Sequence, residues 1–128
     1  TVQMVVVESL IKVKPYKTIE YKYFYRMMKG MIKISERGEH IDLQSYGIEV
    51  ERQDFKGGVL INIERDSICN ISPDRHKVHN LLKLLHDNTV SPIHLVDILG
   101  EYVDAYVNDY SNYNNYSNNT LKKAAEVY

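Results

Sequence analysis

The stretch NISPDRHKVHNLLKLLHDNTVSPIHLVDIL, residues 70–99, decides the fold because it contains two helix starts in close succession. Ser72-Pro73 and Ser91-Pro92 each place a hydroxyl acceptor before a proline, whose missing N–H costs nothing in the first helical turn. After each start, apolar residues recur at intervals of three or four positions, which is typical of a helix with one buried face. The connection is short, about four residues, so the two helices are predicted to form an antiparallel hairpin.

The first half of the chain is typical of β-strands, because polar and apolar residues alternate along it. Tyr21, Tyr23 and Tyr25 are expected on one face of a strand. Gly30 is expected to end this strand, because glycine weakens a strand interior. Residues 31–35 are then expected to form a short return strand.

We therefore predict a single α+β domain over residues 1–108. A mostly antiparallel β-meander of about four or five strands, with a tight hairpin turn at Gly57-Gly58, is followed by an antiparallel α-helical hairpin packed on one sheet face. Residues 109–128 are rich in asparagine and tyrosine, and their apolar residues follow no period that would bury a core. This segment is predicted to be a flexible low-complexity tail.

The composition narrows the range of functions. The chain has 128 residues, and 16 basic and 17 acidic side chains give a net charge of -1. This balance argues against extensive binding to nucleic acid or to an anionic membrane. A single cysteine, Cys69, cannot build an intramolecular disulfide, and no apolar run approaches the roughly 18 residues of a membrane-spanning helix. We expect a cytoplasmic protein without membrane contact, in which Cys69 is a buried, inert thiol.

The first predicted helix carries His76 and His79, whose spacing can bring two imidazoles to one metal ion. Such a site needs further ligands, and Lys83 in the same stripe would repel a cation. A solvated helix edge is therefore the favoured interpretation. A His-dependent metal-binding or hydrolytic enzyme is kept as an alternative, although the sequence predicts neither a catalytic set nor a cofactor.

The tyrosine face suggests a second alternative, a single-stranded nucleic-acid binder, because aromatic rings on a sheet can stack bases. However, Lys22 and Arg26 of the same strand are expected on the opposite face, and the chain has no excess of positive charge. Packing of the tyrosines beneath the helices is therefore the favoured interpretation.

The second predicted helix has a wider apolar arc than one small hairpin is expected to bury. The candidate partner-binding residues on this arc are Val96, Leu99, Val103, Tyr106 and Val107. Either the sheet of the same chain or another molecule can cover the arc. The leading hypothesis is a small non-catalytic protein-interaction or regulatory module that binds a protein partner or associates with itself.

The segments YGIEVERQDF and VSPIHLVDIL, at residues 46–55 and 90–99, carry a resemblance to a known family. Together with the first predicted helix, they resemble an uncharacterised domain-of-unknown-function family of small proteins from spore-forming anaerobic bacteria. The resemblance covers roughly residues 17–107. It implies a compact bacterial cytoplasmic domain, and it implies no particular chemistry.

Overall fold

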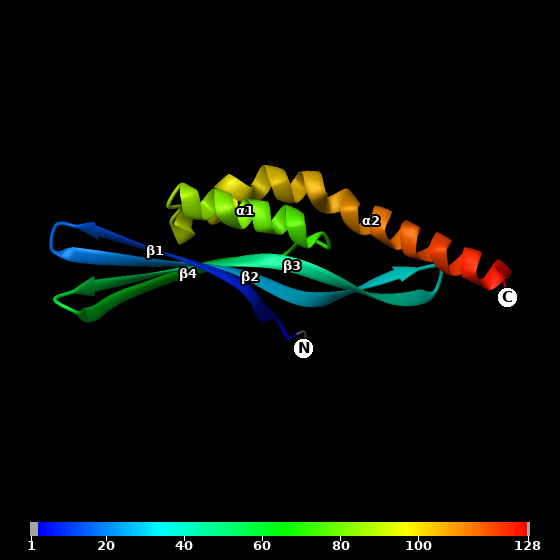
Figure 1. The fold of residues 1–128 in the computed structure, drawn as a ribbon, viewed down its shortest axis with the longest axis horizontal. Coiled ribbons are helices and arrows are strands. Elements are labelled where there is room, and N and C mark those ends of the chain that lie inside the picture. The colour runs from blue at the N-terminus through cyan, green and yellow to red at the C-terminus, as the bar shows by residue number, and fades with distance from the viewer. Residues whose placement is uncertain (1–2, 128) are drawn as a thin grey trace.

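The computed structural model describes residues 3–127, with side chains for residues 3–35 and 37–111. Within this range, four strands precede the helices. Each strand pairs antiparallel with the next, in the order β1-β2-β3-β4, so the predicted meander and the α+β class are confirmed. The elements shown in Figure 1 are β1 (Val5–Tyr16), β2 (Ile19–Glu36), β3 (Glu39–Lys56), β4 (Val59–Ser72), α1 (Arg75–Asp87), the short 3₁₀ helix η1 (Pro92–His94) and α2 (Leu95–Val127).

The core contains side chains of both central strands and both helices, so the helices contact the sheet through shared apolar residues. Tyr25 is fully buried at its centre, and its hydroxyl donates to the carbonyl oxygen of Val90 at 3.0 Å. The interpretation of the tyrosine face as core packing is therefore confirmed. The completely buried apolar residues of this core are Tyr25, Met27, Ile48, Val50, Val78, Leu82, Leu85, Leu95 and Leu99.

The long β2–β3 hairpin differs from the prediction. Strand β2 continues unbroken through Gly30, which pairs with Ser45, so the prediction that Gly30 ends the strand was wrong. Glycine weakens a strand only slightly, and the continuous ladder with β3 outweighs that cost. Because the pairing of β1 with β2 reaches only Lys29, the two long strands extend beyond their neighbours as a two-stranded arm (Figure 1).

The start of α1 also differs from the prediction. Asp74, not Ser72, is the N-cap, and its carboxylate accepts hydrogen bonds from the backbone N–H groups of His76 and Lys77. Ser72 is the last residue of β4, and its hydroxyl accepts a hydrogen bond from the N–H of Asp74. A carboxylate stabilises the positive end of the helix more than a hydroxyl does, which explains the shift of two residues. Ser91 has the predicted position before η1, but its side chain makes no capping hydrogen bond.

The hairpin turn at Gly57-Gly58 is confirmed, since both residues have positive φ angles, of 57° and 78°. Gly47 has a different role, at an irregularity where Tyr46 pairs with Ser72 but Ile48 pairs with Ile68. The additional residues of β4 bulge towards β3 at this point. A Cβ atom at position 47 would lie far inside van der Waals distance of backbone carbonyl oxygens of β4.

We predict that Gly47→Ala lowers the free energy of unfolding by about 1–3 kcal/mol or more, because the methyl group has backbone rather than a flexible side chain to displace. Gly100→Ala is the matched control, because a Cβ at that helical position meets no atom within 4 Å. This control should raise the free energy of unfolding by about 0.5–1 kcal/mol. Urea denaturation of the two variants measures both effects, and equal stabilities would contradict the close approach at Gly47.

Candidate interaction surface

The polar stripe of α1 lies against the edge strand β1. His79 Nδ1 is 2.6 Å from Glu8 Oε1, and His86 Nε2 is 3.2 Å from the backbone carbonyl oxygen of Ile11. Lys12 Nζ donates to the carbonyl oxygen of His86 at 2.7 Å, near the negative end of the helix. His79 and His86 therefore join α1 to β1.

The structure brings His76 and His79 close to one another, with ring centroids 6.5 Å apart and nearly parallel. His79 has Glu8 beside it, so two imidazoles and one carboxylate share this part of the surface. Among the residues that the structure describes, however, no three or more histidine, cysteine, aspartate or glutamate side chains are arranged to hold a metal ion.

A second polar cluster lies on the sheet face opposite the core. Since strand side chains alternate, Glu49 and Glu51 point away from the face that carries Val50. Glu51 is only 3 % exposed, and its carboxylate accepts hydrogen bonds from Arg65 Nε at 2.8 Å and from Gln53 Nε2 at 2.7 Å. Arg65 and Arg26 also form ion pairs with the neighbouring carboxylate of Glu49.

Two opposing effects act on the Glu51 carboxylate. Burial alone would raise the pKa, because it disfavours the charged form, whereas the hydrogen bonds from Arg65 and Gln53 and the charge of Arg26 lower it. The net result is a pKa below the ordinary value for glutamate. Glu51 is thus held as a carboxylate by its neighbours, and its proton affinity is too low for a general acid near neutral pH.

A third cluster fixes the middle of α2. Asp109 accepts hydrogen bonds from Lys77 Nζ at 2.7 Å and from the Ser72 hydroxyl at 3.1 Å. The next residue, Tyr110, has its hydroxyl 2.7 Å from that of Ser45. The backbone of α2 continues through most of the segment predicted to be a tail, and these first two residues of that segment contact β3, β4 and α1. The division into a domain and a flexible tail stays a prediction, and side chains from residue 112 onward lie outside the described part.

The predicted partner-binding residues are divided between the core and the surface of α2. Leu99 is completely buried, and Val103 and Tyr106 pack partly against the core. Val96 and Val107 are 55 % and 61 % exposed, respectively. The sheet of the same chain therefore covers only part of the arc, and binding through the rest stays a prediction.

The sequence prediction overlooked an exposed apolar segment at the outer end of β4. Alternation had suggested one buried face for this strand, yet Val59, Leu60, Ile61 and Ile63 are between 45 % and 63 % exposed. The available signal was the nearly continuous apolar run next to a Gly-Gly turn, which does not alternate as a half-buried strand does.

Cys69 was predicted to be buried, and this was wrong because its side chain is exposed. It belongs to the bulging part of β4, where regular pairing with β3 is interrupted. There it lines a hollow of about 550 Å³ together with Met4 and Met31. The lining also contains the charged residues Lys33 and Asp42, but it contains no histidine that could pair with the thiol as a base.

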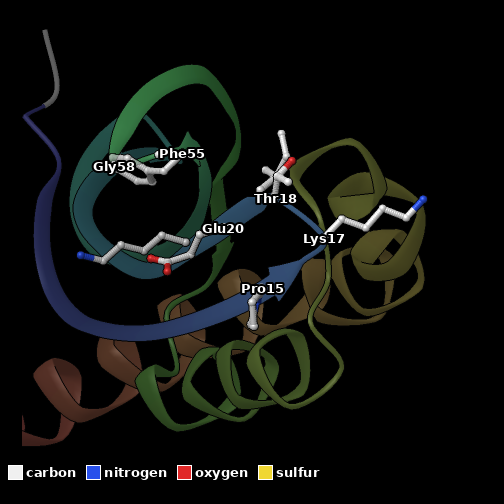
Figure 2. A pocket seen from close by; sticks show the side chains of 9 residues that line it. Pro15, Lys17, Thr18, Glu20, Phe55 and Gly58 are labelled. Carbon is white, nitrogen blue, oxygen red and sulfur yellow. The ribbon is translucent and has the colours of Figure 1, made fainter.

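Another hollow, of about 370 Å³, lies between the turn that joins β1 to β2 and the turn that joins β3 to β4. Figure 2 shows Glu20, Phe55 and Gly58 around it, whereas the side chain of Lys17 extends away from Glu20. Glu20 offers one carboxylate and Phe55 offers one aromatic ring to a molecule in this hollow. The nine lining residues include neither a histidine nor a cysteine that could supply a nucleophile and base pair.

The comparison with protein families adds one finding to this geometry. Residues 4–105 match a family of unknown function, DUF6514. The chain belongs to this DUF6514 family. The matched range includes β1 to β4, α1, η1 and the first third of α2, but not the contacts of Asp109 and Tyr110. The predicted resemblance to a domain-of-unknown-function family is confirmed, and the link to spore-forming anaerobic bacteria stays a prediction.

No curated protein and no solved structure matches this DUF6514 chain. Within the described residues, no helix combines the length and the apolar character that crossing a membrane requires.

We predict that the stability of the wild-type protein falls as the pH is lowered through the acidic range. A carboxylate with a lowered pKa in the folded state contributes stability above its unfolded pKa, and this contribution is lost as the pH falls through the folded pKa. Glu51→Gln should lower the free energy of unfolding at neutral pH by about 1–3 kcal/mol and flatten the acidic part of the profile. Denaturant unfolding across a pH series measures both effects.

The exposed Glu20 supplies the control for this experiment. Glu20→Gln should leave the acidic part of the profile as steep as in the wild type. A Glu51→Gln variant that follows the wild-type profile would contradict the assignment of this pH dependence to Glu51.

Proposed function

We propose that this protein is a small non-catalytic protein-interaction or regulatory module that acts in the bacterial cytoplasm. In this proposal, α1 and α2 form an antiparallel hairpin on one sheet face, and one flank of α2 binds a protein partner. The observation that carries the proposal is the exposure of Val96 and Val107, which contrasts with the complete burial of Leu99 on the same helix.

The spacing along α2 supports a continuous binding stripe. Val96, Gly100, Val103 and Val107 are separated by four, three and four residues, so they lie along one flank of the helix. Ile93 in η1, immediately before α2, is 67 % exposed. Single exposed apolar residues are ordinary on protein surfaces, but a stripe with helical spacing presents a contiguous surface that a partner can cover.

Gly100 gives this stripe a flat centre. A side chain there would meet no atom within 4 Å, so the space above Gly100 is open between the flanking valines. Such an open position lets the backbone or a bulky side chain of a partner approach the helix closely. The polar clusters also support an interaction role, because Glu8, Glu51 and Asp109 are engaged in contacts that hold the fold together.

We predict that Val96→Lys combined with Val107→Lys prevents partner binding while the domain still folds, since both side chains are already exposed. Tagged protein would be expressed in the native host, and the co-purifying proteins would be quantified by mass spectrometry. The double variant should recover at least about tenfold less of the specific partner than the wild type, because two charges would be buried in an apolar interface.

The matched control is Ala105→Lys combined with Asn108→Lys, which adds the same charge to exposed positions on another side of α2. This control should recover the partner as the wild type does. If all three proteins recover the same partners in equal amounts, the flank of α2 is not the binding surface.

A further inference from the structure

The two edge strands of the sheet are protected unequally. Along β1, Arg75 Nη2 is 3.4 Å from the carbonyl oxygen of Val7, and His86 Nε2 binds that of Ile11. Side chains of α1 therefore occupy outward-pointing backbone groups that another strand would need. The outer part of β1 also contains two lysines and a proline, at Lys12, Lys14 and Pro15, which are residue types that discourage strand addition.

The outer end of β4 has no such lysine or proline residues. Residues 59–63, VLINI, contain no charged residue and no proline, and the turn before them is Gly57-Gly58. Protection begins further along the strand, at Asp66, whose carboxylate accepts a hydrogen bond from the N–H of Ser67. The unprotected part of the edge therefore coincides with the exposed apolar segment.

We propose that residues 59–64 of β4 pair antiparallel with the same residues of a second copy of this chain, so that the two sheets join along their β4 edges. The inference rests on the proposed interaction role and names the partner for a second surface. A strand that adds to an open edge gains main-chain hydrogen bonds, while side chains on each face determine which strand fits.

The register follows from the pairing of β4 with β3. Leu60 pairs with Phe55 and Ile63 pairs with Gln53, so Leu60 and Ile63 point to the same sheet face. In a regular strand, residues three positions apart point to opposite faces. Leu60 and Ile63 share a face because Ile61 is an extra residue in β4 without a partner in β3. A two-fold axis between Ile61 and Asn62 then places Leu60 opposite Ile63 of the partner subunit, and Ile63 opposite the partner subunit's Leu60.

On the other face, the same axis places Val59 opposite the partner subunit's Glu64. Glu64 is at the end of the paired segment and already has Arg52 Nη2 at 3.3 Å, so no like charges face each other. If the axis were moved to Ile63, Leu60 would instead stand opposite Asp66 of the partner subunit, although the pairing of Asp66 with Val50 places its side chain on the other sheet face. The first register is therefore favoured, because directly opposed residues of an antiparallel pair have their side chains on the same sheet face.

The bulge at Ile61 limits the strength of this association. Bulges increase local twist and are a common means of discouraging edge pairing. Here the bulge lies beside the two-fold axis, so both copies bend at the same point and the strands keep their register on either side. Six residues per chain bury less area than a typical stable interface, which needs about 800 Å² per partner, so a reversible dimer is expected.

The first test measures the mass of the purified full chain by sedimentation velocity over a concentration series. The wild type should shift from the monomer towards twice the chain mass as the concentration rises into the high micromolar range. Leu60→Lys should weaken dimerisation at least about tenfold, because it places a lysine opposite an apolar partner residue. Val13→Lys is the matched control on the protected edge, since Val13 and Leu60 are 48 % and 45 % exposed, and it should dimerise as the wild type does.

The second test determines the register by disulfide trapping in a Cys69→Ser background, which removes the native exposed thiol. A mixture of the Leu60→Cys and Ile63→Cys variants should cross-link faster than either variant alone, because directly opposed residues have Cβ atoms close enough for a disulfide. Faster cross-linking of either variant with itself would overturn this register.

A wild-type protein that remains monomeric at the highest soluble concentration would overturn the proposal, and so would a Leu60→Lys variant that dimerises as the wild type does. The first of these results is also the one expected if an extended segment of a different protein binds this edge. Because both tests use the purified chain alone, their failure leaves the partner recovery by the flank of α2 unaffected, and the two proposals can fail separately.

Discussion

The hydroxyl of Tyr25 holds together the parts of this fold that are far apart in the sequence. Its ring is buried at the centre of β2, lies parallel to Tyr23 at 6.1 Å, and meets the ring of His86 edge-on at 5.8 Å. The hydroxyl binds the carbonyl oxygen of Val90, in the connection between the helices. Burial, together with the neighbouring Tyr23, raises the pKa of Tyr25 well above its ordinary value, so the phenol remains a hydrogen-bond donor.

This contact joins β2 to the connection between α1 and α2, and further polar contacts lie beside it. At one end of α1, the carbonyl oxygen of His86 accepts a hydrogen bond from Lys12, and the ring of His86 contacts the carbonyl oxygen of Ile11. Beyond the connection, Leu95 and Leu99 enter the same core. Of the two histidines that first suggested a metal site, His79 contacts Glu8 of the same edge strand, and side chains that cover a sheet edge discourage the addition of another strand.

Two groups of apolar residues remain exposed. One lies at the outer end of β4, and the other lies on the side of α2 that faces away from the core. The outer end of β4 extends to the Gly57-Gly58 turn, whereas the β4 residues that share a hollow with η1 are those at 63–66. On α2, the side that faces the core contains Leu95 and Leu99, while Val96 and Val107 remain exposed. Two separate surfaces follow from this arrangement, one a sheet edge and the other a helix flank, and each suits a different kind of contact.

The sequence by itself determined the α+β class, the antiparallel meander followed by helices, the Gly57-Gly58 turn and the buried tyrosine and leucine faces. These features depend on local periodicity and turn chemistry, which neighbouring residues express directly. Only the tertiary structure decided that β2 continues through Gly30, that Asp74 caps α1, that Cys69 is exposed, and which edge of the sheet is protected. Three of these depend on a partner distant in the chain, namely the ladder with β3, the bulge opposite Gly47 and the reach of α1 over β1. The cap at Asp74 depends on the continuation of β4 to Ser72.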